Sequence, residues 1–343
     1  MTGTSMDGVD AVGVSIHGRG LDMTATFEAI ASVELGELAS TLRHISTGNG
    51  STTELDSAAT ELGLLTVEAI QQLQLESIDL IALHGQTIFH KPPTSIQLID
   101  PAPVLDAYPC TILTDPRKAD LEHGGQGAPI TPLADWVMFR SREASTAIVN
   151  LGGFCNITLL QADAEPDSIR GFDVCCCNLV LDAIARQCLN EPYDHCGSKA
   201  LQGSLDTDVY SQLLKELELQ RTAHRSLGSE DDLGEFAVDI GQHLSPADLL
   251  ASVASAIGSC ITNAIQDADR VYLAGGGIHN VALANAIHHD GTTDDLGVPT
   301  QAREAMAMAI LGALAQDGES ITLSNITGRK ETDDPIGWVY ARP

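Results

Sequence analysis

The segment from Ala147 to Asn156 reads AIVNLGGFCN. Its first five residues, Ala147 to Leu151, form a short apolar run that predicts a buried strand. Gly152 and Gly153 follow at once, and glycine lets a backbone approach a ligand closely because it has no Cβ. Taken alone, Gly-Gly after a strand is more often a turn than a phosphate site. This segment therefore indicates a phosphate site only in combination with similar segments elsewhere in the chain.

The regions around this segment alternate between strand-like and helix-like patterns. Asp79 to Leu83 and Arg270 to Ala274 are further short apolar runs, whereas Leu55 to Leu73 and Leu249 to Ile265 carry apolar residues at spacings of three and four. This alternation predicts an α/β fold with a parallel or mixed sheet flanked by helices. At ~100–200 residues per domain, 343 residues suggest two domains. A polar stretch over 140–145 marks the boundary, so we expect domains 1–142 and 143–343, with the last residues returning to the first.

The chain is strongly acidic, with a net charge of -29 and a pI near 4.4. Such a charge repels phosphate backbones and anionic lipid, which excludes nucleic acid and membrane surfaces as expected partners. The chain has 18 Lys plus Arg, so a bound phosphate must rely on backbone N–H groups, helix N-termini and Mg²⁺. No stretch approaches the ~20 apolar residues of a membrane span, and three of the eight cysteines are consecutive, unlike a secreted disulfide framework. We expect a cytoplasmic protein.

Two more glycine-rich segments resemble the first, MTGTSMDGVD at residues 1–10 and AGGGIHN at residues 274–280. Neither G-x-x-x-x-G-K-[ST] nor a helix-opening G-x-G-x-x-G occurs, which argues against a P-loop or a Rossmann site. The set is similar to the actin/hexokinase-like superfamily, which has one phosphate loop in each half and a third loop for adenosine. The residues this assigns to nucleotide or phosphate are Gly3, Thr4, Ser5, Met6, Asp7, Gly8, Val9, Asp10, Gly152, Gly153, Asn156, Gly275, Gly276, Gly277 and Asn280.

Several motifs are more specific. His84-Gly85-Gln86-Thr87 is followed by His90, then by a D-x-R-x-x-D segment from Asp115 to Asp120, and then by GGQGAP at residues 124–129. In this order, and with the opening MTGTSMDGVD, they resemble the anhydro-N-acetylmuramic acid kinases. The resemblance runs from the first residue almost to the last.

The resemblance implies a two-lobed actin/hexokinase-like (ribonuclease H-like) α/β fold with an active-site cleft between the lobes. It implies phosphorylation of 1,6-anhydro-N-acetylmuramic acid by ATP with hydrolytic opening of the anhydro ring, and a homodimer. It assigns Asp173 as the base that activates water, Glu304 as a residue that orients water or sugar, and Arg117 as a partner for negative charge. The residues assigned to the sugar are His84, Gln86, Asp115 and Gln126. Asp7 and Asp10 are candidates for Mg²⁺.

Each assignment has a structural alternative. An Asp at a strand end, such as Asp173, is usually a cap or turn residue. His84 and His90 are equally well explained as core histidines, and Asp115 with Arg117 as a structural ion pair. An acidic residue at the start of a helix, such as Glu304, is favoured by the helix dipole alone.

Two departures from the family pattern bear on activity. The family's D-T-G-P-G-N segment is here Asp173-Val174-Cys175-Cys176-Cys177-Asn178, which adds Cβ atoms where positive φ or a close ligand approach is needed. Adjacent cysteines cannot easily converge on one tetrahedral ion, so buried thiols are the expected reading. The apolar residues that precede the family's opening motif are also nearly absent, which predicts a truncated first strand or a start upstream. A non-catalytic binding protein, and a kinase for a different amino sugar, stay as alternatives.

Overall fold

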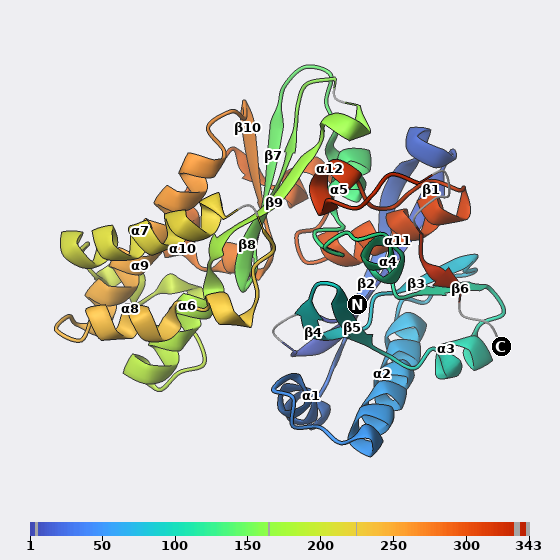
Figure 1. Ribbon diagram of the computed structural model, residues 1–343, viewed down its shortest axis with the longest axis horizontal. Coiled ribbons are helices and arrows are strands. Elements are labelled where there is room, and N and C mark those ends of the chain that lie inside the picture. Colours follow the sequence, from blue (N-terminus) through green and yellow to red (C-terminus); the bar gives the residue numbers. More distant parts are fainter. Residues whose placement is uncertain (4–5, 164, 224, 333–336, 341–343) are drawn as a thin grey trace. The chain divides into compact units, whose positions relative to one another are not determined.

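The computed structural model describes residues 1–3, 6–163, 165–223, 225–332 and 337–340 (Figure 1). The chain divides into two compact units, unit 1 (Met1–Phe139 with Gly297–Pro343) and unit 2 (Arg140–Leu296). The first boundary thus lies close to the predicted one after residue 142. The second domain was expected to extend over 143–343, but the chain returns to unit 1 from Gly297 on. The return is longer than expected because it includes an apolar helix, α11 (Arg303–Gln316), that packs on strands of unit 1.

Unit 2 contains a five-stranded mixed sheet in the order β11-β10-β7-β8-β9. Its central strand β7 runs parallel to β10 and antiparallel to β8, and β8 is antiparallel to β9. Every residue of β7 is buried, which explains why four of its six residues are apolar. The strands are β7 (Thr146–Leu151), β8 (Phe154–Leu160), β9 (Arg170–Cys176), β10 (Arg270–Ala274) and β11 (Gly291–Thr292).

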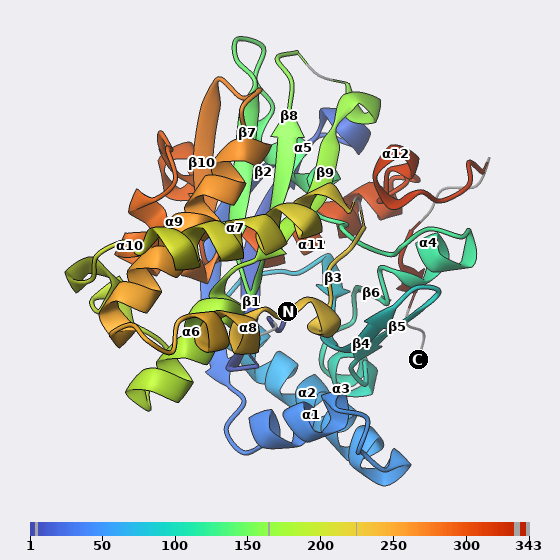
Figure 2. The ribbon, with the colours of Figure 1, turned by 60° about the vertical axis from the view of Figure 1, so that its left-hand side comes forward.

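The helices of unit 2 lie together on one side of this sheet (Figure 1). Figure 2 shows the two longest, α7 and α9, lying side by side, and both pack against β9. Ser245 caps the start of α9 and is followed by proline at the first helical position, a combination that favours initiation. The helices are α6 (Asn178–Ile184), α7 (Thr207–Thr222), α8 (Gly234–Ile240), α9 (Pro246–Ala264) and α10 (Val281–Asn285).

Unit 1 contains three separate groups of strands. β1 pairs antiparallel with β2, β4 pairs antiparallel with β5, and β3 pairs parallel with β6, which also pairs with β12. The strands are β1 (Gly8–His17), β2 (Thr24–Glu34), β3 (Leu80–Leu83), β4 (Gln86–Lys91), β5 (Thr94–Leu98), β6 (Thr111–Thr114) and β12 (Val339–Tyr340).

The helices of unit 1 cover these strands. The longest, α2, packs on β1 and β2, and its start is fixed by a capping box in which Ser51 and Glu54 bond each other's backbone N–H. The helices are α1 (Leu38–Ser46), α2 (Thr52–Gln72), α3 (Ala102–Ala107), α4 (Lys118–Glu122), α5 (Pro132–Phe139), α11 and α12 (Ser324–Thr327).

The strands β1 and β3 both pack on α11, yet no strand in the described part of the chain pairs with both of them. In unit 2 the corresponding place, between β8 and β10, is filled by β7. The first residues of the chain fold back on β1 instead, through a bridge between Thr2 and Val9 and a 2.6 Å bond from the Met1 amino group to the Asp10 carbonyl.

The strongest periodic patterns match the structure closely. The predicted strands around residues 80, 148 and 272 are β3, β7 and β10, and the two predicted helices are α2 and α9. Within the described residues, α9 is the one helix long and apolar enough to cross a membrane. Ten of its residues are buried, among them Leu250, Val253 and Ile257, which belong to the hydrophobic core of unit 2, so it is a core helix.

Candidate active-site residues in the two units

The predicted base, Asp173, lies on β9 of unit 2, paired in register with Asn156 of β8. Its Oδ2 accepts a 2.8 Å hydrogen bond from the backbone N–H of Leu227. The strand ladder has a bulge between Cys155 and Asn156, and bulges re-aim side chains near functional sites. Asp173 is therefore held by two elements, its own strand and the segment that carries Leu227.

The three consecutive cysteines continue β9 from Asp173 to the start of α6. Cys175 pairs with Cys155 in the sheet, the N–H of Cys176 donates to Gln220 Oε1 at 2.8 Å, and the N–H of Cys177 donates to the Gly153 carbonyl at 2.8 Å. None of the three has a positive φ, so none needs the left-handed conformation that favours glycine. The backbone of this segment forms without the glycines of the family pattern.

The cysteine side chains are buried thiols, as expected from the sequence. Burial raises the pKa of the Cys176 thiol to about 12 and raises the pKa of Cys155 and Cys177 as well. Within the described ranges no three His, Cys, Asp or Glu side chains come together as a metal site. Thiols with such high pKa values are protonated at neutral pH and are poor nucleophiles.

The glycine loops of unit 2 approach the carboxyl ends of β7 and β10. A Cβ on Gly275, whose φ is +81°, would lie 2.7 Å from Asn150 Oδ1, and one on Gly277 would lie 2.6 Å from the Leu151 Cβ. Glycine is therefore required for the 275–277 loop to pass so close to β7. Gly152 accepts the N–H of Asn178, at 3.1 Å.

Asn280, also assigned to the nucleotide, has a structural role in this conformation. Its Oδ1 accepts a 3.1 Å hydrogen bond from Leu283 N–H and so caps α10. Among the other assigned residues, Gly276 has open space where a Cβ would be.

The N-terminal loop of unit 1 is only partly described, and Thr4 and Ser5 lie outside the described residues. Met6 has a φ of +52° and is buried, and Val9 is 1% exposed in the core of unit 1. These two assigned residues therefore face the core with their side chains. Asp10 Oδ1 accepts a hydrogen bond from the Ser32 hydroxyl, and Asp7 is exposed.

His84 and Arg117 form a contact in unit 1. His84 Nδ1 lies 2.9 Å from the Gly85 carbonyl and its Nε2 lies 3.3 Å from Arg117 Nη2. Burial, reinforced by the Arg117 charge, lowers the pKa of His84 to about 3. The imidazole is therefore neutral, with its proton on Nδ1 and Nε2 accepting from Arg117. His84 is thus a buried histidine that is bonded to backbone, and it also contacts Arg117.

The β4–β5 hairpin next to this pair holds polar atoms that are buried without a hydrogen-bond partner among the described residues. They are Gln86 Oε1, His90 Nε2 and Gln97 Oε1. Ser95 Oγ lies 2.8 Å from His90 Nδ1 and accepts from Gln97 Nε2 at 2.7 Å. Buried polar groups are nearly always paired, so these atoms are suited to a polar ligand.

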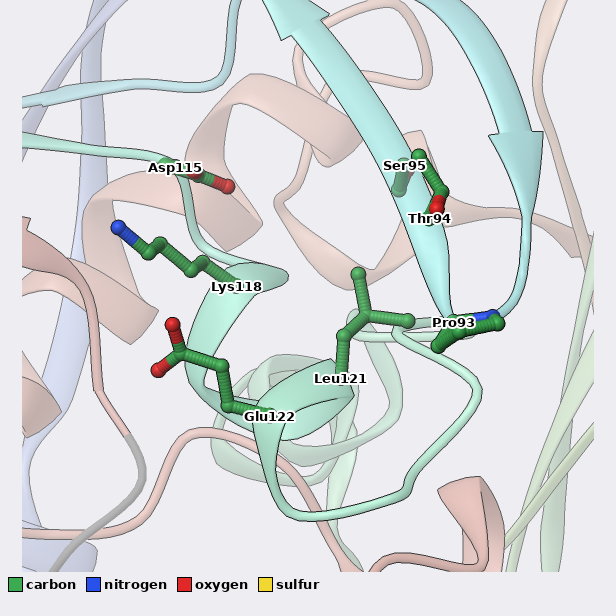
Figure 3. Close-up of a pocket in the computed structure, with 7 residues that line it drawn as sticks. All are labelled: Pro93, Thr94, Ser95, Asp115, Lys118, Leu121 and Glu122. Carbon is green, nitrogen blue, oxygen red and sulfur yellow. The ribbon is translucent and has the colours of Figure 1, made fainter.

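A cavity of about 490 Å³ opens beside the hairpin in unit 1 (Figure 3). Asp115, one of the residues assigned to the sugar, lines this cavity and has a φ of +51°. Burial raises the pKa of Asp115, and Lys118 opposes that shift. The lining residues are Pro93, Thr94, Ser95, Asp115, Lys118, Leu121 and Glu122.

The GGQGAP loop is tied to the C-terminal part of unit 1. The Asp120 carboxylate, fully buried, accepts from Gly127 N–H at 2.8 Å and from the Thr327 hydroxyl at 2.7 Å. The N–H of Gln126 donates to the Thr327 carbonyl at 2.9 Å. These bonds hold the backbone of Gln126, a residue assigned to the sugar.

Glu304 is the second residue of α11 and is half-buried in the first turn of the helix. Its neighbour Arg303 is 1% exposed and pairs with the fully buried Asp135 of α5, through Nε to Oδ1 at 2.9 Å and through Nη2 to Oδ2. The ion pair fixes the start of the helix that carries Glu304.

The assigned residues thus fall into two sets. Asp173, Asn156 and the glycine loops at 152–153 and 275–277 belong to unit 2, whereas the N-terminal loop, Arg117, Glu304 and the sugar set belong to unit 1. Our reading of the sequence missed Gln97, Ser95 and Lys118. Lys118 has a visible signal, since it directly follows Arg117 in a chain with few basic residues. The polar alternation of the hairpin gives no comparable signal.

The chain was compared with known proteins. The family model described as anhydro-N-acetylmuramic acid kinase matches residues 1–341. The chain is 31% identical to the anhydro-N-acetylmuramic acid kinase of Salinibacter ruber, over 96% of this chain and 92% of the relative. It is 30% identical to that of Gloeobacter violaceus, over 99% and 97%. A solved activator of the 2-hydroxyisocaproyl-CoA dehydratase from Clostridium difficile is similar at 11% identity, with a TM-score of 0.43, over 90% of this chain and 96% of that chain. A likeness that remote says nothing about function.

Proposed function

Because the chain belongs to the anhydro-N-acetylmuramic acid kinase family, we propose that it phosphorylates 1,6-anhydro-N-acetylmuramic acid with ATP and opens the anhydro ring with water. The products are N-acetylmuramic acid 6-phosphate and ADP, which suits the recycling of peptidoglycan. The proposal is carried by the family match over residues 1–341. This family has the two-lobed α/β fold of actin/hexokinase-like sugar kinases.

The reaction exchanges two pairs of bonds. The oxygen of water forms a bond to C1 of the sugar as the bond from C1 to O6 breaks. O6 forms a bond to the γ-phosphorus of ATP as the bond from that phosphorus to the β,γ-bridging oxygen breaks, releasing ADP. The water must lose a proton, so a carboxylate base is needed near C1.

We assign that base to Asp173. Its carboxylate is oriented by the Leu227 N–H, and a general base must be held within reach of the proton that it abstracts. Its position on a strand rather than on a loop suits a residue that must be aimed accurately.

Arg117 and Glu304 are assigned to the sugar side of the reaction. Arg117 keeps its positive charge at all relevant pH values, and its Nη2 lies 3.3 Å from Nε2 of the neutral His84. It is suited to the lactyl carboxylate of the substrate or to charge on the transferred phosphoryl group. Glu304 orients water or sugar. His84, Gln86, Asp115 and Gln126 complete the set for the sugar.

ATP is assigned to the glycine loops around Gly3, Gly152 and Gly275. Asp7 and Asp10 offer carboxylate oxygens, the ligands that Mg²⁺ prefers, and Mg²⁺ commonly takes one or two protein carboxylates with water and phosphate oxygens. When bound, Mg²⁺ supplies positive charge against the phosphates of ATP. The chain itself supplies backbone N–H groups at the loops.

The remaining expectations are also proposals. We propose a cytoplasmic protein that forms a homodimer, by resemblance to the family. The net charge of -29 supports the expectation that neither nucleic acid nor a membrane surface is a partner.

The test is ADP release by the purified protein with ATP and Mg²⁺ in the presence of 1,6-anhydro-N-acetylmuramic acid. N-Acetylmuramic acid and N-acetylglucosamine serve as parallel substrates, and Asp173→Asn serves as the variant without the base. We expect release that depends on the anhydro sugar and is lost in the variant. Turnover with another sugar alone would reassign the substrate, and no turnover from a folded protein would reject the kinase.

A further inference from the structure

A polar segment, residues 225–231, folds over Asp173 in unit 2. It follows α7 and precedes α8, and it supplies the Leu227 N–H that bonds Asp173 Oδ2 at 2.8 Å. Leu227 itself is buried, at 8% exposed. We propose that Gln220 of α7 is a positioning residue that ties this segment to β9 and thereby sets the orientation of the Asp173 carboxylate. This inference rests on the role of Asp173 in the proposed function.

The Gln220 side chain joins the two elements directly. Its Oε1 accepts the N–H of Cys176 at 2.8 Å, and its Nε2 donates to the carbonyl of Asp231 at 2.7 Å. Cys176 is the last residue of β9, the strand that carries Asp173, and Asp231 ends the segment that carries Leu227. Gln220 is 9% exposed, so both ends of a buried amide are used for this link.

Hydrogen bonds within the segment connect Asp231 to the residues around Leu227. The Asp231 carboxylate accepts from Arg225 Nη1 at 2.8 Å and from the Gly228 N–H at 2.8 Å, and the Asp231 N–H donates to the Gly228 carbonyl at 2.8 Å. The Asp231 side chain is 7% exposed. Residues on both sides of Leu227 are therefore fixed to Asp231.

The link between Gln220 and β9 depends on the backbone N–H of Cys176, the third residue after Asp173. A residue with a backbone N–H is needed at position 176 to satisfy Gln220 Oε1, and proline has none. A buried amide that loses one partner costs free energy comparable to a lost hydrogen bond. The Gln220 side chain therefore depends on the backbone N–H of Cys176 as its hydrogen-bond donor.

The consequence for the proposed reaction is geometric. A carboxylate bonded through one oxygen to a fixed N–H has a defined rotation about its terminal torsion, and small errors in the placement of a base lower the rate strongly. Releasing the segment leaves Asp173 in place on β9 but loosens the Leu227 bond, one of the contacts that orient its carboxylate. The expected effect falls on kcat, with little change in KM for ATP.

The informative variant is Gln220→Glu. It keeps the side-chain length and an oxygen for the Cys176 N–H, but it places an oxygen without a proton against the Asp231 carbonyl. Gln220→Met removes both bonds with little change in size and adds no charge. Ser252→Ala is the matched control, because Ser252 is a fully buried residue of α9 that accepts the Asp206 N–H at 2.8 Å and donates to the Asp248 carbonyl at 2.7 Å.

Hydrogen exchange followed by mass spectrometry gives a readout that does not require activity. With the full chain, we expect the amides of 225–231 to exchange about fivefold to tenfold faster in both Gln220 variants, the change that corresponds to one released hydrogen bond. Ser252→Ala should leave the exchange of 225–231 at the wild-type rate. Unchanged exchange in both Gln220 variants, or an equal increase in Ser252→Ala, overturns the proposal.

Steady-state kinetics then addresses orientation. We expect kcat to fall by about fivefold or more in both Gln220 variants, with KM for ATP within about twofold of the wild type. A loss that falls on KM for ATP alone contradicts the positioning role. If the wild-type protein has no kinase activity but the exchange result is as expected, the link between Gln220 and the segment stands and the proposed function fails, so the two failures are distinguishable.

Discussion

Replacing Asp135 by asparagine removes the negative charge that compensates Arg303 in the interior of unit 1. Both side chains are almost completely buried, and they are joined through two parallel contacts. Removing one partner of a buried ion pair costs about 3–5 kcal/mol, because the remaining charge is left in a medium that solvates it poorly. We therefore expect Asp135→Asn to lower the free energy of unfolding by about that amount.

Urea denaturation followed by tryptophan fluorescence measures this loss. The chain has two tryptophans, Trp136 and Trp338, and both are buried in unit 1, so the signal reports on the unit that contains the ion pair. With a urea dependence of ~1–3 kcal/mol per molar, the midpoint should fall by about 1–5 M. Asp135→Leu with Arg303→Met should recover most of the loss, since apolar replacement of a buried pair is often neutral.

The control for this experiment is Glu331→Gln, which removes an exposed carboxylate 4.0 Å from Arg329 in the same unit. Exposed pairs contribute about 0–1 kcal/mol, so its midpoint should stay close to the wild type. If Asp135→Asn shifts the midpoint no more than Glu331→Gln does, or if the double variant is less stable than the single one, the reasoning about the buried pair is refuted.

Three further predictions concern single positions. Gly275→Ala should raise KM for ATP and lower stability by about 1–2 kcal/mol, because its φ is positive and its Cβ would meet Asn150 Oδ1; wild-type kinetics would contradict this. His84 has a pKa of about 3 in the folded protein and 6.5 ordinarily, so its contribution to the free energy of unfolding should be fully present above about pH 6.5 and be lost as the pH falls toward 3. His84→Gln should flatten that pH dependence in urea titrations at several pH values. A thiol reagent should label the exposed Cys188 and Cys196 of the native protein ahead of the five buried cysteines, and peptide mass spectrometry showing early labelling of a buried thiol would be inconsistent with the fold.

The strongest periodic segments were predictable because their patterns are local. Ala147 to Leu151 is apolar except for Asn150 because β7 is buried on both faces. Leu249 to Ile265 has helical spacing because one face of α9 packs in the core. Only the last residues were expected to return to unit 1, but the chain returns from Gly297 on, and the returning part includes α11. Its destination depends on packing against β1 and β3, which no local pattern encodes.

The residues of the candidate site were predictable where a motif marks them, and the contacts that hold them were not. Asp173 and His84 stand in recognisable segments, so their residue types suggested their roles. The bond from Leu227 to Asp173 and the bond from Cys176 to Gln220 connect positions 44 or more residues apart. Neither Leu227 nor Gln220 has a distinctive sequence context. The side chains of Val9 and Met6 pack in the core of unit 1, so a ligand of the N-terminal loop would meet their backbone.

The most direct test of the proposed reaction follows the oxygen atom of water. The protein is incubated with ATP, Mg²⁺ and 1,6-anhydro-N-acetylmuramic acid in water enriched in oxygen-18, and the products are analysed by mass spectrometry. We predict one oxygen-18 atom in the phosphorylated sugar and none in its phosphoryl group, because water attacks C1 while O6 receives phosphorus. A phosphorylated sugar without the label, or label found in inorganic phosphate, would contradict ring opening coupled to phosphoryl transfer.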